Sequence, residues 1–175
     1  MGRGRGAQDP RPVKTVSDGE RQAFAKSASA AQVATVTYSY SLSPDFTQIR
    51  VIADVALWKP VGKQGGLTPL YRQRIAAIAE LGKRSYDHAE NVAQWSAGGG
   101  ALARASITAA VGRLERLIPF ALGLTQADLN ALDNPKADRQ FAAGFYGPPV
   151  KAFAIAPGET LIWSKALISA MPAQE

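Results

Sequence analysis

Two segments that alternate between apolar and polar residues, separated by a short turn sequence, constrain the fold of this chain most strongly. In residues 33–42 the apolar side chains take every second position, and residues 48–58 repeat the pattern. A period of two places these side chains on one face of a β-strand. Between the segments, Pro44 presets a backbone angle and Asp45 can hydrogen-bond its own backbone, as is typical of turns. The sequence therefore predicts an antiparallel hairpin over residues 33–58.

One face of the first predicted strand is entirely apolar or aromatic. It carries Val36, Tyr38, Tyr40 and Leu42. Two tyrosines on a strand can stack nucleic-acid bases, but their alignment with two aliphatic residues favours packing against the core or a helix.

A second hairpin is predicted near the C-terminus. Residues 150–155 and 160–164 flank Ala156-Pro-Gly-Glu159, which is a turn sequence. Residues 165–171 either extend the last strand or form a turn of helix. We expect an α+β domain in which an antiparallel sheet, built from the N- and C-terminal hairpins, packs its apolar face against helices.

Helices are predicted from capping residues, apolar spacings of three or four, and terminating glycine or proline. These signals occur at about residues 18–30, 87–97, 101–118 and 125–133. The helix at 101–118 has the clearest apolar stripe, and Pro119 is expected to end or kink it.

Residues 68–82 fit two structures. Thr68 followed by Pro69 is typical of a helix start, and Tyr71, Ile75 and Ile78 then share a helical face. Apolar residues of the same stretch also alternate with arginines, as in a strand. Helix propensity favours the helix slightly, and a third strand stays open.

Composition excludes several kinds of chemistry. The chain has no cysteine, so it has no disulfide framework, thiol nucleophile or cysteine-ligated metal. His88 is the single histidine and is expected to face solvent in the first turn of a helix. Gly98-Gly-Gly100 lies between two predicted helices and is interpreted as a linker, because a phosphate loop follows a strand. We predict no enzyme activity, no metal and no cofactor.

The chain is basic, with a formal net charge of +6 and a pI of about 9.8. Residues 1–15 combine glycine and proline with four basic side chains, which predicts a flexible basic tail before a single domain at 16–175. The candidate anion contacts in this tail are Arg3, Arg5, Arg11 and Lys14. No run of about 18 apolar residues occurs, so no membrane span is predicted.

Two further features are candidate contacts. The loop around Phe145, Tyr146, Pro148 and Pro149 is a candidate partner contact, because aromatic side chains on a stiff segment lose little entropy on binding. Folding of these aromatics back over the sheet is the slightly favoured alternative. Asp54 is the carboxylate whose burial in the sheet would alter its chemistry, although a solvent-side pair with Arg50 is the favoured interpretation.

The order of several motifs resembles that of uncharacterised exported or lipoprotein-type proteins of Gram-negative bacteria. The motifs are Tyr38-Ser-Tyr-Ser-Leu-Ser-Pro-Asp45 continuing into Ile49-Arg-Val51, then Leu70-Tyr-Arg72, and Glu90-Asn-Val-Ala-Gln-Trp95 before the long helix. The resemblance covers about residues 32–124. It implies an exported location and a strand at 70–81, and it transfers no catalytic residue. The chain departs from such proteins in lacking a signal peptide and a lipidated cysteine.

Three functions follow as expectations. The leading one is a non-enzymatic protein of the cell envelope that acts by contact with another protein or envelope component. The second is a basic nucleic-acid-associated protein that uses the Arg-Gly tail, and the third is a small-ligand-binding protein. We expect a periplasmic or envelope location if a signal peptide has been removed, and a cytoplasmic location otherwise.

Overall fold

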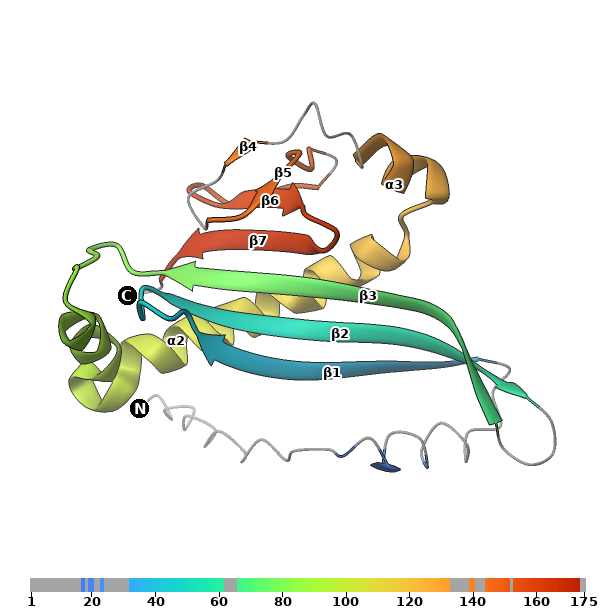
Figure 1. Ribbon diagram of the computed structural model, residues 1–175, viewed down its shortest axis with the longest axis horizontal. Coiled ribbons are helices and arrows are strands. Elements are labelled where there is room, and N and C mark those ends of the chain that lie inside the picture. The colour runs from blue at the N-terminus through green and yellow to red at the C-terminus, as the bar shows by residue number, and fades with distance from the viewer. Residues whose placement is uncertain are drawn as a thin grey trace, which may run out of the picture.

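A five-stranded sheet with one long helix across one face forms the centre of the computed structural model (Figure 1). The structure describes residues 17, 19–20, 23, 32–61, 66–132, 139–140, 144–151 and 153–173. The sheet contains β1 (Val33–Leu42), β2 (Gln48–Val61), β3 (Gly66–Glu80), β6 (Thr160–Trp163) and β7 (Leu167–Pro172). The other elements are α2 (His88–Leu122), α3 (Gln126–Leu132), β4 (Arg139–Gln140) and β5 (Tyr146–Gly147).

The predicted N-terminal hairpin is confirmed. β1 and β2 pair antiparallel from Val33 opposite Trp58 to Leu42 opposite Ile49. The turn between them is closed by the amide of Ser43, which donates to the carbonyl oxygen of Gln48 at 2.9 Å. Among the described residues, β1 lies at one edge of the sheet, whose strand order is β1-β2-β3-β7-β6.

The sheet is mixed rather than antiparallel. β3 pairs antiparallel with β2 but parallel with β7, in a register that sets Ile75 opposite Leu167. A parallel pair requires a long crossover connection. Residues 81–166 provide it, and they include α2. The α+β class is therefore confirmed, whereas the prediction of an antiparallel sheet is wrong.

The C-terminal hairpin is also displaced from its predicted position. β6 pairs with β7 around a turn at Lys165, whose φ is 52°. The predicted turn at 156–159 does form, with the Glu159 amide donating to the Ala156 carbonyl at 3.0 Å. Of the residues before this turn, 148–150 pair with β6, and the strand predicted at 150–155 is absent from the described residues.

Packing explains why the chain leaves the sheet after Val150. The ring of Phe153 packs against Phe120 of α2, with ring centroids 4.9 Å apart. It also lies 4.8 Å from the guanidinium of Arg113. The segment therefore turns away from β6 towards the helix, where its aromatic side chain is partly buried.

Residues 66–80 form a strand, so the helix favoured at 68–82 is wrong. Ile75, Ala77 and Ala79 face α2, whereas Ala76 and Ile78 join a second apolar cluster on the opposite face. A central strand covered on both faces lacks clear alternation, and this run therefore also fits a helix. Pro69 lies next to a register shift between Leu57 and Trp58, which is where a strand accepts proline.

Helix α2 begins as predicted at the N-cap Asp87, whose side chain accepts from the Ala89 amide at 2.8 Å. The predicted linker at Gly98-Gly-Gly100 is confirmed, because these residues leave the helical conformation and have φ values of 57°, 67° and 82°. Three successive left-handed residues are sterically accessible only to glycine. The expectation that Pro119 ends the helix is wrong, since one further turn leads to the C-cap at Gly123, and the alternative of a kink stays a prediction.

The main core lies between α2 and the sheet. The predicted apolar stripe of the helix is confirmed, and its most buried members are Ala110, Leu114 and Leu117; Ala121, beyond the predicted end of the helix, is buried as well. Trp95 and Trp163 belong to the same cluster, while Trp58 is partly buried and donates to Thr35. The three tryptophans thus lie in the core or at its rim.

Two predicted caps are confirmed by their hydrogen bonds. The Ser17 and Glu20 side chains each accept from the other residue's backbone amide, and Thr125 with Asp128 forms the same arrangement before α3. Gly19, Glu20 and Ala23 are helical. The rest of the helix predicted at 18–30, like the tail at 1–15, lies outside the described residues.

Candidate functional site

The apolar face of β1 is exposed. Its four alternate side chains, here called the β1 stripe, are Val36, Tyr38, Tyr40 and Leu42, with exposed fractions of 40%, 43%, 68% and 47%. They lie on the same side of the sheet as the buried β2 residues opposite them. The expectation that the two tyrosines pack against the core or a helix is therefore wrong for Tyr40, the most exposed of the four.

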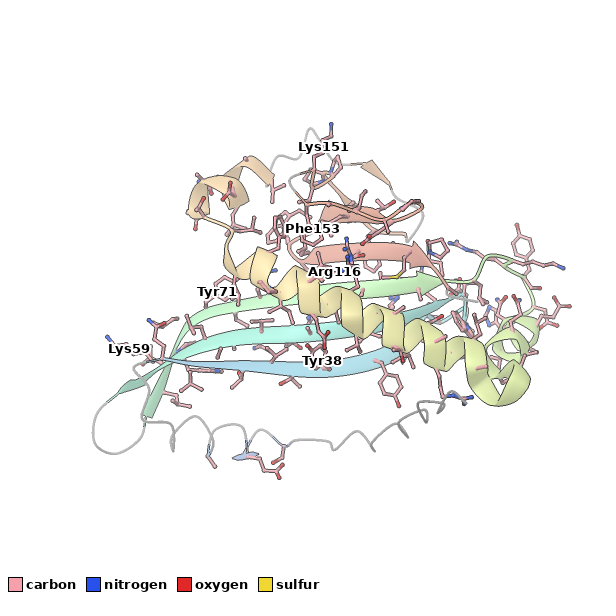
Figure 2. The ribbon with its side chains drawn as sticks, turned by 180° about the vertical axis from the view of Figure 1, so that it is seen from behind. Tyr38, Lys59, Tyr71, Arg116, Lys151 and Phe153 are labelled. Atoms are coloured by element: carbon pink, nitrogen blue, oxygen red, sulfur yellow. The ribbon has the colours of Figure 1, made fainter. Side chains whose placement is uncertain are left out.

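The position of α2 explains this exposure. The helix packs against β3 and β2 and crosses the sheet diagonally, which leaves β1 at the margin of the covered area (Figure 2). Partial burial, with a smaller contribution from the negative charge of Glu115 on α2, raises the pKa of Tyr38. Tyr38 therefore borders the helix, whereas Tyr40 is more exposed to solvent.

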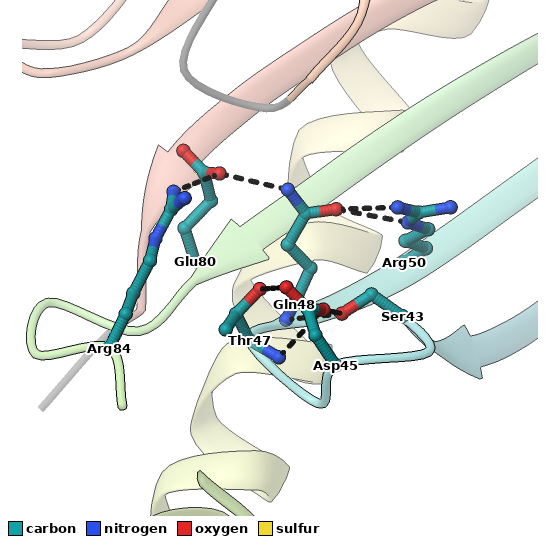
Figure 3. A network of polar contacts seen from close by, with 7 residues as sticks. All are labelled: Ser43, Asp45, Thr47, Gln48, Arg50, Glu80 and Arg84. Atoms are coloured by element: carbon teal, nitrogen blue, oxygen red, sulfur yellow. Dashed lines mark hydrogen bonds and ion pairs between the residues drawn. The ribbon is translucent and has the colours of Figure 1, made fainter. Parts of the chain in front are cut away.

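A cleft of about 530 Å³ lies at the end of the sheet near the β1–β2 turn. We call it the turn cleft; its lining includes Asp45, Gln48, Arg50, Arg84 and Phe145. The Arg50 guanidinium stacks over the Phe145 ring at 5.3 Å and donates twice to Gln48 Oε1, at 3.0 and 2.8 Å. Gln48 in turn donates to Glu80, which also accepts from Arg84 at 2.7 Å (Figure 3).

Asp45 organises the turn itself. Its carboxylate accepts from the Ser43 hydroxyl at 2.5 Å and from the Thr47 hydroxyl at 2.9 Å (Figure 3). These hydrogen bonds, that of Ser43 first, lower the pKa of Asp45 to about 2. Because hydrogen bonds to the charged form cause the shift, the carboxylate stabilises the folded turn when it is ionised.

Replacing Asp45 with asparagine should reduce the acid sensitivity of the protein. The native pKa lies below the ordinary value of 3.8, so the stabilisation is present above about pH 4 and is lost as the pH falls towards 2. Asp45→Asn should lower the midpoint of thermal unfolding at pH 7 and flatten its decline between pH 4 and 2. Thermal unfolding followed by circular dichroism checks this, and parallel curves for the two proteins would contradict it.

Two buried side chains of α2 hold the turn in place. Asn91 is fully buried, and its amide nitrogen donates to the carbonyl oxygens of Asp45 and Ser85, each at 2.9 Å. Trp95 Nε1 donates to the Phe46 carbonyl at 2.7 Å. Sequence reasoning did not single out Asn91, because a polar residue in the first turns of a helix is usually exposed. The one sequence feature that could have indicated burial of Asn91 is its position four residues before Trp95, which places both side chains on the same face of the helix.

The candidate partner loop is only partly available for contact. Phe145 is half-buried against the second apolar cluster, and Pro148 is buried. Pro149 is exposed, while the side chain of Tyr146 lies outside the described residues. The basic side chains proposed as anion contacts, Arg3, Arg5, Arg11 and Lys14, also lie outside them.

The structure does not bring the remaining candidates together into a site. His88 is exposed in the first turn of α2, as predicted, with its ring centroid 6.0 Å from that of Phe46. The predicted pair of Asp54 with Arg50 is wrong. Asp54 contacts Arg74 at 3.4 Å and Arg72 at 4.0 Å, because cross-strand neighbours on β3 are closer than a residue two pleats away.

Two kinds of feature are absent from the described part of the chain. Its helices include none that is both long and apolar enough to cross a membrane. Nor does it contain a group of three or more His, Asp or Glu side chains placed to hold a metal ion.

Comparison with known proteins identifies no relative. No family model matches this chain, and no curated protein or solved structure is significantly similar to it. Functional conclusions therefore depend on the chain's own residues.

Proposed function

We propose that this protein is a non-enzymatic binding protein of the cell envelope that takes up an extended segment of another polypeptide along the outer edge of β1. The observation that carries the proposal is the coincidence of an edge strand with the exposed β1 stripe. An edge strand offers a row of backbone donors and acceptors, and an added strand can pair with them. Alternate apolar side chains of that strand would contact the β1 stripe.

The composition of β1 supports this proposal. Proteins usually protect an edge strand with lysine, proline, a bulge or a short length. β1 has ten residues and contains neither a charged residue nor proline or glycine, and the register with β2 is regular throughout. At the other edge, β6 has four residues, and residues 148–150 pair with it. The two edges of the sheet therefore differ in how they are protected.

Photo-crosslinking at Tyr40 tests the proposal. A photoreactive phenylalanine derivative is introduced in place of Tyr40, and in a matched control in place of Tyr86, a fully exposed aromatic residue in the loop before α2. We expect irradiation of the cells that make the protein to join position 40, but not position 86, to a defined polypeptide. The additional substitution Tyr38→Lys should abolish that product. Equal products at both positions, or none at 40, would contradict the proposal.

The envelope location is a separate part of the proposal and is supported by the resemblance described above. Fractionation of the source cells, together with the intact mass of the native protein, tests it. A periplasmic or membrane fraction is the expected result. A cytoplasmic protein that begins at Met1 would instead favour the nucleic-acid function of the Arg-Gly tail.

The turn cleft favours a second candidate, the binding of a small anionic ligand. Arg50 and Arg84 line it beside an aromatic ring. Both guanidinium groups, however, already donate to side chains of the protein, namely Gln48 and Glu80. A ligand would have to replace these contacts, and we therefore rank this candidate second. Binding of small carboxylates that is lost in Arg50→Gln would favour it.

A further inference from the structure

We propose that the strand added at β1 is β1 of a second copy of this chain, paired antiparallel about a twofold axis at Ser39. This inference rests on the proposed function and names its partner. Its starting point is the order of side chains along β1, in which two aromatic residues lie between two aliphatic ones.

The β1 stripe is complementary to itself in this register. With Ser39 opposite Ser39 of the second copy, Tyr38 lies opposite Tyr40, and Val36 lies opposite Leu42. Every member of the stripe then faces another member, and aromatic or aliphatic cross-strand pairs of this kind stabilise antiparallel sheets. On the other face of the strand, Thr37 lies opposite Ser41, so polar residues also meet polar residues.

Charge also favours a second copy over a partner of different chemistry. β1 carries no charged residue, so it cannot select an acidic or basic segment by complementary charge. Pairing two uncharged strands brings no like charges together within the strand pair. A shift of the register by one residue would place the β1 stripe opposite polar side chains and leave it exposed, because side chains alternate between the two faces.

The expected dimer is weak. In this register residues 36–42 of each copy pair, and one pair of seven-residue strands lies at the low end of specific interfaces, below about 1,200 Å². We therefore expect a dissociation constant in the micromolar range and a joint sheet of ten strands, with α2 of both copies on the same face.

Cysteine crosslinking tests the register directly, because the full-length chain has no cysteine of its own. A disulfide formed by one introduced cysteine must therefore join two copies. Residues directly opposite each other in an antiparallel pair have Cα atoms about 4.5–5.5 Å apart, which is within the range of a disulfide. Ser39→Cys alone should form a dimer quickly under mild oxidation.

Two further variants serve as matched controls. In the proposed register, two copies of residue 37 lie about four residues apart along the strands, or roughly 13 Å, beyond disulfide reach. Thr37→Cys and Ser41→Cys should each stay monomeric alone but should form a mixed dimer when combined. Circular dichroism confirms that each variant is folded, and nonreducing electrophoresis measures the products.

Several results would overturn the inference. The first is that the Ser39→Cys variant crosslinks no faster than the Tyr86→Cys variant. The second is that all variants with one introduced cysteine crosslink equally fast. A third is a photo-crosslink from position 40 to a different protein with none to a second copy, which would leave the proposed function intact. A crosslink from position 40 to residues 1–31 of the same chain would instead overturn both proposals.

Discussion

Replacing Glu159 with glutamine should lower the free energy of unfolding by about 3 kcal/mol or more. Glu159 forms a buried ion pair with Nε of Arg113, and each side chain is only 2% exposed. Two further contacts fix the carboxylate, the Ser169 hydroxyl at 2.5 Å and the Ala156 amide at 2.9 Å. Loss of the negative charge leaves the Arg113 guanidinium buried without compensation, and Nη1 and Nη2 of that group have no hydrogen-bond acceptor among the described residues.

Urea unfolding of five variants measures this effect: Glu159→Gln, the control Glu115→Gln, the single replacements Arg113→Met and Glu159→Leu, and the double variant that combines these two. Glu115→Gln removes an exposed acid from α2, two residues after Arg113, and should change stability by less than about 0.5 kcal/mol. The double variant Arg113→Met, Glu159→Leu removes both charges and should be more stable than either single replacement. A loss below about 1 kcal/mol in Glu159→Gln, or simple additivity in the double variant, would contradict the interpretation.

Gly147→Ala should destabilise the fold by about 3–5 kcal/mol, because the new methyl group meets backbone atoms that cannot rotate away. A Cβ at residue 147 would lie 1.9 Å from the Trp163 carbonyl oxygen and 2.8 Å from its carbonyl carbon. Residues 147–150 would have to separate from β6. Separation breaks the hydrogen bonds from the Trp163 amide to Pro148, 3.0 Å, and from the Val150 amide to Leu161, 2.9 Å.

Gly112→Ala is the matched control for this prediction. Gly112 lies inside α2, and a Cβ there would meet nothing within 4 Å. Alanine should stabilise the helix by about 0.5–1 kcal/mol. The two glycine replacements are thus expected to shift the urea midpoint in opposite directions, and shifts of equal sign would show that close contact at β6 is not the cause.

Local patterns predicted the elements whose signals are confined to one segment. Alternation gave the first hairpin, capping residues gave the start of α2, and the spacing of Ala110, Leu114 and Leu117 gave its buried face. The β3 strand was only the second of two interpretations of residues 68–82, because its buried run has apolar residues on both faces, a property that depends on β2 and β7 as neighbours. Partners distant in sequence are not visible in a local pattern.

The candidate sites also combine features that depend on one segment, which were predicted, with features that depend on distant residues, which were not. The turn at Asp45 was predicted from its residue types, whereas the support from Asn91, 46 residues later, was not. Exposure of the β1 stripe could not be predicted, because alternation identifies the apolar face of a strand but not whether a helix extends over it. The pair of Arg113 and Glu159 was not predicted, because arginine and glutamate, each considered alone, are usually exposed.

The parallel pairing of β3 with β7 has a consequence for how the protein is made. The partners Ile75 and Leu167 are separated by about 90 residues, so a ribosome completes β1, β2, β3 and α2 long before β7 emerges. Until then the nascent sheet has a second open edge, at β3. Contacts between distant residues also slow folding. During the synthesis of the last quarter of the chain, β3 therefore has β2 as its one neighbour among the described strands, and its open edge is available for pairing with another chain.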